Sequence, residues 1–296
     1  MEKIGFIGLG IMGNPMAGHI LKNGYEMIVN DTSEAAQNNL AAKGAKIGTL
    51  AEIGGNCGVI FTMLPDGAVV QQVLFAENGV ASTAKAGSLV VDMSSVTPVE
   101  SKTCAEKLKN KGIGFLDAPV SGGEPGAINA TLAFMVGGKQ SDFDKASPFF
   151  DIMGSSAVLI GDSGSGSVTK LVNQVIVNMN IAVVAEALVM AVKAGVDPEK
   201  VYKAIRGGLA GSNVLDAKAP MMIARNFQPG GKISINHKDV KNVMGTAHAI
   251  DAPMPLTSQL FEIMQVLKIR GHMDDDHSGI VQYFESLAGV KVGKGS

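Results

Sequence analysis

The chain has 296 residues, of which 46% are hydrophobic and 18% charged, so it is too apolar to be disordered and long enough for one large domain or two ordinary ones. Its 25 Lys and Arg residues nearly balance 27 Asp and Glu residues and form no basic run, which argues against a nucleic-acid partner. The two cysteines, Cys57 and Cys104, match no metal-ligand spacing and indicate a reducing compartment, so we expect a cytoplasmic protein.

In the first half of the chain, short Val- and Ile-rich runs alternate with helical patterns, as in a parallel α/β sheet. Strands are predicted at Lys3–Ile7, Glu26–Asn30, Val59–Met63, Ser88–Asp92, Gly114–Leu116, Leu132–Val136 and Ala157–Ile160. Helices are predicted at Met12–Lys22, Glu34–Ala42, Val69–Phe75, Val99–Lys109 and Phe143–Ile152, with Ser33 and Thr97-Pro98 as start signals. Most strands are continuous apolar runs, as expected when helices cover both faces. We therefore predict a Rossmann-type, doubly wound, mostly parallel sheet over residues 1–162.

After the glycine-rich segment that ends at Gly166, the strand patterns largely stop. Helices are predicted at Ser167–Ala194, Pro198–Ile205, Val214–Ala224, Lys238–Ala249, Leu256–Lys268 and Ser278–Leu287. The first is long and apolar, but Asn178, Asn180 and Glu186 interrupt it, so we expect a buried helix rather than a membrane span. The N-terminus lacks the basic segment of a signal peptide. We expect an all-α domain over residues 163–296 whose apolar helix joins subunits into a homodimer or homotetramer.

A glycine-rich turn joins the first predicted strand to the first predicted helix, and its residues are Gly8-Leu9-Gly10-Ile11-Met12-Gly13. In the dinucleotide-binding pattern the first glycine makes a tight turn, the second admits a pyrophosphate, and the third lets the helix pack on the strand. Asp31 ends the second strand, where a carboxylate accepts hydrogen bonds from ribose hydroxyls, and Thr32 offers no cation for a 2′-phosphate. We expect NAD as the cofactor, with NADP possible, although flavin and S-adenosylmethionine proteins share related turns.

Hydride transfer to a carbonyl requires a proton donor near the oxygen. No tyrosine has a lysine four residues later, and His272 and His277 flank three aspartates that predict a charged loop rather than a metal site. Lys170 is the better candidate, because it begins a long apolar helix after a glycine hinge, with Asn173 on the same face. Two interpretations stay open: the ammonium extends to solvent from a buried helix, or it faces a cleft between domains, where partial desolvation makes it a better proton donor.

Taken together, these segments resemble the β-hydroxyacid dehydrogenase family. The opening segment Phe6–Ala17 is similar to the family signature, and Asp117–Gly123 is similar to its substrate-binding loop. Gly164-Ser165-Gly166, followed by Lys170 and Asn173, is similar to its catalytic motif, G-x-G-x-x-x-K-x-x-x-N. Lys238-Asp239 is similar to the lysine segment that approaches the cofactor from the helical domain. The likeness extends from residue 3 to about residue 290.

The resemblance implies roles for the substrate-side residues. Lys170 would be the general acid in reduction and the base in oxidation, and Asn173 would bind substrate oxygens. A substrate carboxylate would be held by the Ser121 hydroxyl and by the backbone amides of Gly122 and Gly123, where no Cβ is in the way. The same loop also has a purely structural interpretation as a tight interstrand turn, and Asp117 as a brace for it.

The resemblance also implies a cofactor site and an activity. Beyond the glycine turn, the cofactor riboses and the nicotinamide side would be lined by Met63, Leu64, Pro65, Ser95 and Lys238. Lys238 has an alternative interpretation as a surface helix residue that pairs near Asp239.

Within the family, three stretches carry the closer resemblance, and they are Val120–Pro125, Lys170–Ile176 and Arg206–Lys218. This resemblance implies the reduction of tartronate semialdehyde to D-glycerate, without a metal. The alternatives are a related acid or aldehyde (3-hydroxyisobutyrate, a sulfonated aldehyde or succinic semialdehyde) and a non-catalytic NAD-binding scaffold.

Overall fold

The computed structural model describes residues 2–293 of the chain. They form two compact units, the first ending at Lys170 and the second beginning at Leu171. The division falls within one long helix, α9 (Ser165–Lys193). A domain boundary at Ser163, where the strand patterns stop, stays a prediction.

The first unit is built on a nine-stranded sheet with the order β3-β2-β1-β4-β5-β6-β8-β7, in which β9 pairs with β8. Strands β3, β2, β1, β4, β5 and β6 pair in parallel in that spatial order. Strand β8 is antiparallel to β6 and β7, and β9 is parallel to β8. The bounds are β1 Ile4–Ile7, β2 Met27–Asn30, β3 Lys46–Ile47, β4 Val59–Thr62, β5 Leu89–Asp92, β6 Gly114–Asp117, β7 Val120–Ser121, β8 Leu132–Gly137 and β9 Gly154–Gly161. This order confirms the predicted doubly wound, mostly parallel sheet.

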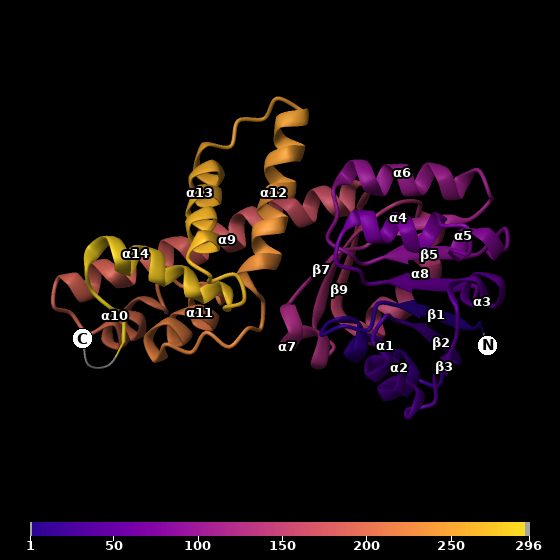
Figure 1. Ribbon diagram of the computed structural model, residues 1–296, viewed down its shortest axis with the longest axis horizontal. Coiled ribbons are helices and arrows are strands. Elements are labelled where there is room, and N and C mark those ends of the chain that lie inside the picture. Colours follow the sequence, from indigo (N-terminus) through magenta and orange to yellow (C-terminus); the bar gives the residue numbers. More distant parts are fainter. Residues whose placement is uncertain (1, 294–296) are drawn as a thin grey trace. The chain divides into compact units, whose positions relative to one another are not determined.

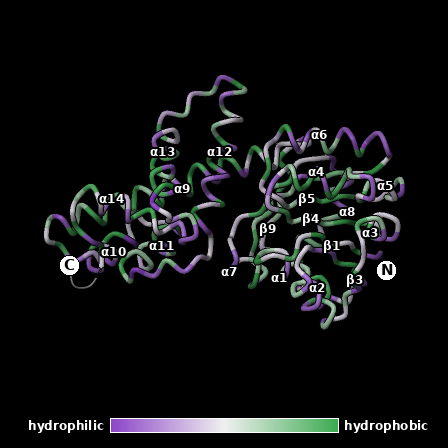
Figure 2. The backbone as a smooth tube through the Cα atoms, viewed as in Figure 1, coloured by the Kyte–Doolittle hydropathy of each residue, from purple (hydrophilic) through white to green (hydrophobic). Residues whose placement is uncertain are grey.

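Helices cover both faces of this sheet, with α4 and α6 on one side and α1 on the other (Figure 1). The side chains of the central strands β1, β2, β4, β5 and β6 alternate between two apolar cores: Phe6 and Phe61 lie in one, and Ile7 and Ile60 in the other. Hydrophobic residues therefore run along the central strands without a polar face (Figure 2). The helices are α1 Gly13–Lys22, α2 Glu34–Ala41, α3 Leu50–Asn56, α4 Gly67–Phe75, α5 Val80–Thr83, α6 Pro98–Lys109, α7 Gly123–Ile128 and α8 Gln140–Met153.

The second unit is helical in its described part. Its elements are the larger part of α9, α10 Pro198–Ile205, α11 Asn213–Ala224, α12 Ile233–Ala249, α13 Pro255–Ile269, the 3-10 turn η1 His277–Ile280 and α14 Val281–Ala288. By length and composition alone, helix α9 could cross a membrane. However, 44% of its most apolar 18-residue segment is buried inside the structure. Its residues Ile181, Ala185 and Leu188 lie in the core of this unit, and such core helices meet the same two criteria.

Several short elements were not predicted, and two helices begin well before their predicted starts: α8 begins at Gln140 rather than Phe143, and α12 begins five residues early. The missed elements are β3, α3, α5, β7 and α7. Each is at most seven residues long, and α3 and α7 contain two glycines each, so none carries a full apolar period. Helix α12 begins at Ile233 rather than Lys238. Its first turn is held by the Asn236 side chain, which donates to the Lys232 carbonyl, and by the buried side chain of Ile233.

Candidate active site

The glycine turn has the shape that a dinucleotide phosphate requires. A methyl group on Gly8, where φ is 91°, would overlap the Met63 carbonyl, and one on Gly13 would overlap the Gly8 carbonyl. A methyl group on Gly10 would meet no atom within 4 Å, so the backbone there is open to a ligand. Helix α1 begins after Met12 with no side-chain cap and no acidic residue in its first turn, as expected of an anion-binding helix end. The neighbouring Ile11 is exposed.

Asp31 lies directly beside this turn at the end of β2. Its Oδ2 atom accepts the Leu9 N–H at 2.5 Å, and its Oδ1 atom accepts the Ser33 N–H at 2.7 Å. The carboxylate is therefore fixed where β2 ends, one residue before the exposed Thr32. The residues fit the adenosine half of a dinucleotide, because the turn admits the pyrophosphate and a fixed acceptor stands beside it.

The ends of β4 and β5 are joined by polar residues that the sequence patterns did not single out. Thr62 Oγ1 donates to Asp92 Oδ1 at 2.8 Å, and the Leu64 N–H donates to Ser94 Oγ at 2.9 Å. Burial raises the pKa of Asp92 above its ordinary value. These bonds hold together the segments that carry two sets of predicted cofactor residues, which are Met63, Leu64 and Pro65 after β4 and Ser95 after β5.

The predicted substrate loop leaves the sheet at β7 and enters α7 with two glycines in the left-handed region. The φ angles are 136° at Gly122 and 61° at Gly123, which explains why the loop uses glycine here. Lys170 Nζ donates to the Val120 carbonyl at 2.8 Å, one residue before Ser121. The first unit therefore brings the candidate proton donor and the candidate carboxylate loop together.

Asp117 fixes the start of the helix that carries Lys170. Its Oδ1 and Oδ2 atoms accept the backbone N–H groups of Gly164 and Ser167, at 2.7 and 2.8 Å. A methyl group on Gly166 would overlap the carbonyls of Met135 and Asp117, so this glycine lets α9 begin in contact with the sheet. Burial raises the pKa of Asp117 to about 6, against the effect of the two backbone N–H donors. Asp117 thus acts as a brace.

The second unit contains the other two predicted site residues in one hydrogen-bonded chain. Asn173 Nδ2 donates to Gln174 Oε1 at 3.0 Å, Gln174 Nε2 donates to Asp239 Oδ2 at 2.5 Å, and Lys238 Nζ pairs with Asp239 Oδ1 at 3.1 Å. The motif K-x-x-x-N places its amide four residues after the lysine, and that position holds Gln174, so the match through Asn173 was off by one residue. A glutamine one turn after Lys170 in an apolar helix was the missed signal.

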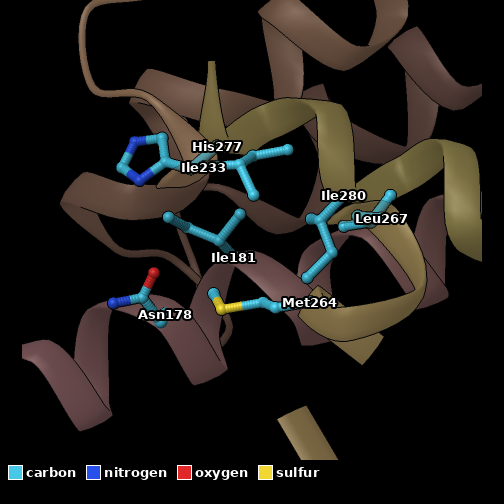
Figure 3. A pocket seen from close by; sticks show the side chains of 7 residues that line it. All are labelled: Asn178, Ile181, Ile233, Met264, Leu267, His277 and Ile280. Carbon is cyan, nitrogen blue, oxygen red and sulfur yellow. The ribbon is translucent and has the colours of Figure 1, made fainter. Parts of the chain in front are cut away.

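The two histidines near the C-terminus lie in different surroundings. His272 pairs with Asp275 at 3.0 Å. Figure 3 shows His277 and Asn178 beside an otherwise apolar cavity, which has no room for a water molecule. Desolvation lowers the pKa of His277 to about 4, so the ring is neutral at neutral pH. Across residues 2–293, no three His, Cys, Asp or Glu side chains lie close enough to hold a metal ion.

Comparisons with known proteins identify the family of the chain. Residues 3–161 match the family model of the NAD binding domain of 6-phosphogluconate dehydrogenase, and residues 164–284 match the model for NAD-binding of NADP-dependent 3-hydroxyisobutyrate dehydrogenase. The chain is 39% identical to a 2-hydroxy-3-oxopropionate reductase of Escherichia coli K12, over 98% of this chain and 99% of the relative.

Two further matches have similar coverage. The chain is 36% identical to 2-(hydroxymethyl)glutarate dehydrogenase of Eubacterium barkeri, over 99% of this chain and 98% of the relative. A structure of Mycobacterium tuberculosis 3-hydroxyisobutyrate dehydrogenase with L-serine superimposes with a TM-score of 0.87 at 29% identity, covering 95% of this chain and 98% of the other.

Proposed function

The chain belongs to the family of NAD(P)-dependent β-hydroxyacid dehydrogenases, and from this premise we propose that it reduces tartronate semialdehyde to D-glycerate. Tartronate semialdehyde is 2-hydroxy-3-oxopropionate, the substrate in the name of the Escherichia coli relative. Reduction adds a hydride to the aldehyde carbon and a proton to its oxygen, and one NAD(P)H is consumed. The bound reduced nicotinamide supplies the hydride.

One observation carries the proposal: the contact at 2.8 Å between Lys170 Nζ and the carbonyl of Val120, beside the substrate loop. A substrate carboxylate on Ser121 Oγ and on the amides of Gly122 and Gly123 would place the aldehyde oxygen near this ammonium. Lys170 then donates its proton to that oxygen as negative charge develops there. Because the carboxylate is held by a hydroxyl and by backbone N–H groups, the loop favours short acids over neutral aldehydes.

The residues near Asp31 support NADH over NADPH. The Asp31 carboxylate would repel a 2′-phosphate, and Thr32 offers no compensating cation. In steady-state kinetics with tartronate semialdehyde, we expect kcat/KM to be at least about tenfold higher with NADH, which corresponds to about 1.4 kcal/mol. A preference for NADPH would contradict this assignment.

The activity is tested with a panel of aldehydes and acids. The purified protein is given NADH and, separately, tartronate semialdehyde, succinic semialdehyde and a three-carbon sulfonated aldehyde, and the oxidation of 3-hydroxyisobutyrate is measured with NAD. We expect the highest kcat/KM with tartronate semialdehyde and D-glycerate as its product. A higher value with another compound reassigns the substrate, and no NADH oxidation with any of them favours the non-catalytic scaffold.

Helix α9 supports an additional proposal, that the protein is a homodimer or homotetramer. Its apolar side chains Val172, Ile176, Val183 and Met190 are exposed. An apolar stripe of this kind on a long helix is typical of a surface that a second copy covers. Light scattering coupled to size-exclusion chromatography gives the mass directly, and Ile176→Asp should lower it.

A further inference from the structure

We propose that His19 is a positioning residue that holds the substrate loop against the cofactor-binding helix α1. Its ring nitrogen Nε2 lies 3.0 Å from the Ala127 carbonyl oxygen and 3.0 Å from the Ile128 carbonyl oxygen. His19 is in the last turn of α1, and both carbonyls are at the end of α7, the helix that continues from the substrate loop. The inference rests on the proposed function, because it takes Ser121–Gly123 as the segment that binds the substrate carboxylate.

Helix α7 is too short to hold this loop in place by itself. It has six residues, and two of them are glycines. Isolated helices of this length are unstable in water, and glycine weakens them further. Helix α1 packs beside it (Figure 1), and the buried Ala127 lies in the core that also contains Met16 and Ala17 of α1. The position of the loop therefore depends on contacts with α1.

His19 completes the hydrogen bonds at the end of α7. The carbonyls in the last turn of a helix have no partner within it. Backbone N–H groups of the following turn donate to the Pro125 and Gly126 carbonyls, at 3.0 and 2.9 Å. The next two carbonyls are those of Ala127 and Ile128, and His19 Nε2 faces both. The imidazole thus caps α7 from a neighbouring helix, as a basic residue in a last turn caps its own helix.

This geometry determines which ring nitrogen of His19 carries the proton. A carbonyl oxygen can only accept, so a nitrogen that faces two carbonyls must carry the hydrogen. The neutral ring is therefore the Nε2–H tautomer. A glutamine at this position keeps an N–H donor at a similar reach, whereas a leucine is comparable in size and has no donor. The two substitutions separate the hydrogen bonds from the volume of the side chain.

Steady-state kinetics of His19→Leu and His19→Gln test the role. With tartronate semialdehyde we expect His19→Leu to raise KM roughly threefold to tenfold, the change that one hydrogen bond corresponds to. The substrate carboxylate keeps its charge during the reaction, so it is bound equally in the ground and transition states, and kcat should stay within about twofold. His19→Gln should restore KM to within about twofold of the natural value. The NADH Kd of both variants should be unchanged, because the phosphates approach the opposite end of α1.

The matched control is Asn23→Ala, at the same end of α1. The Asn23 side chain donates to the backbone carbonyl of His19 at 2.9 Å, so its removal weakens the end of α1 and leaves the imidazole in place. We expect a lower urea midpoint and an unchanged KM. If His19→Leu also lowers the midpoint and leaves KM unchanged, His19 only stabilises the fold and the proposal is overturned.

A second measurement uses the natural chain, needs no substrate and stands even if His19→Leu does not fold. In nitrogen NMR spectra of protein with isotope-labelled histidine, His19→Gln identifies the His19 signals. We expect the neutral ring to carry its proton on Nε2. A proton on Nδ1 overturns the contact with α7, and the proposal with it.

The outcomes separate this inference from the proposed function. A KM effect of His19→Leu on another acid of the panel, together with no turnover of tartronate semialdehyde by the natural chain, rejects the proposed substrate and keeps the role of His19. No turnover of any panel compound by the natural chain rejects both. Full turnover of tartronate semialdehyde with a KM that is insensitive to His19→Leu keeps the proposed function and rejects the role of His19.

Discussion

Asp117 is the residue on which the position of Lys170 depends most directly. Both of its carboxylate oxygens accept backbone N–H groups where α9 begins, and Lys170 follows within the next turn. A carboxylate is required because protonation turns one of its two acceptor oxygens into an O–H group, which is a donor and a much weaker acceptor. Its pKa of about 6 is raised by burial, so the bracing form predominates only above that pH.

This predicts a pH dependence of the activity. As pH falls through about 6, Asp117 gains a proton, one N–H group loses its acceptor, and kcat/KM should decrease. Asp117→Asn should be roughly tenfold less active at neutral pH and should lack that decrease, as measured by kcat/KM from pH 5 to 8. Asp151→Asn, which changes an exposed carboxyl on α8, should keep the natural profile. An Asp117→Asn protein with full activity and an unchanged profile would show that the brace has no catalytic effect.

The glycine turn and α1 act together as one element, and two substitutions separate folding from cofactor binding. Gly10→Ala meets open space, so the free energy of unfolding should change by less than about 1 kcal/mol, while NADH affinity falls at least tenfold because the methyl group stands where the pyrophosphate approaches. Gly13→Ala should destabilise the protein by several kcal/mol, because its methyl group overlaps the Gly8 carbonyl. Chemical denaturation and calorimetry measure the two effects. Normal NADH binding by Gly10→Ala would place the cofactor elsewhere.

Elements were predicted well where local chemistry decides them. Strands such as β4 and β5 are apolar on both faces, so their sequences predict buried strands directly. Ser33 and Thr97 begin helices α2 and α6, as predicted. Helix α3 was missed although Thr49 and Glu52 form a capping box, because Gly54-Gly55 interrupts its short pattern. The pairing of β8 with β7 and β9 depends on contacts between segments far apart along the chain, which local patterns do not contain.

The candidate site was predictable only in part for the same reason. The spacing of Gly8, Gly10 and Gly13 could be interpreted from the sequence, because a side chain at Gly8 or Gly13 would overlap a backbone carbonyl and Gly10 is open. The interpretation of Asp117 as a brace agrees with its two hydrogen bonds to the start of α9. The contact between Gln174 and Asp239 joins residues 65 positions apart and depends on how α9 packs against α12. No spacing rule along the sequence could contain it.

The stability of the whole molecule should depend on pH through His277. The folded pKa of about 4 lies below the unfolded value of 6.5, so the unfolded chain binds the extra proton first as pH falls. The neutral ring's contribution is complete above about pH 6.5 and is lost toward pH 4, by an amount on the order of 2 kcal/mol. The difference in unfolding free energy between the natural chain and His277→Gln, measured by urea denaturation from pH 4.5 to 7.5, should shrink by that amount as pH falls. A difference that is constant with pH would contradict the burial of a neutral ring.

The central claim is that the Lys170 ammonium donates the proton to the aldehyde oxygen. The most direct measurement is the turnover of Lys170→Ala alongside its affinity for NADH. We predict that kcat falls by a factor on the order of 10²–10⁴ while the NADH Kd stays within about twofold, and that added small primary amines restore part of the rate. Turnover close to that of the natural chain, with NADH binding intact, would contradict the claim.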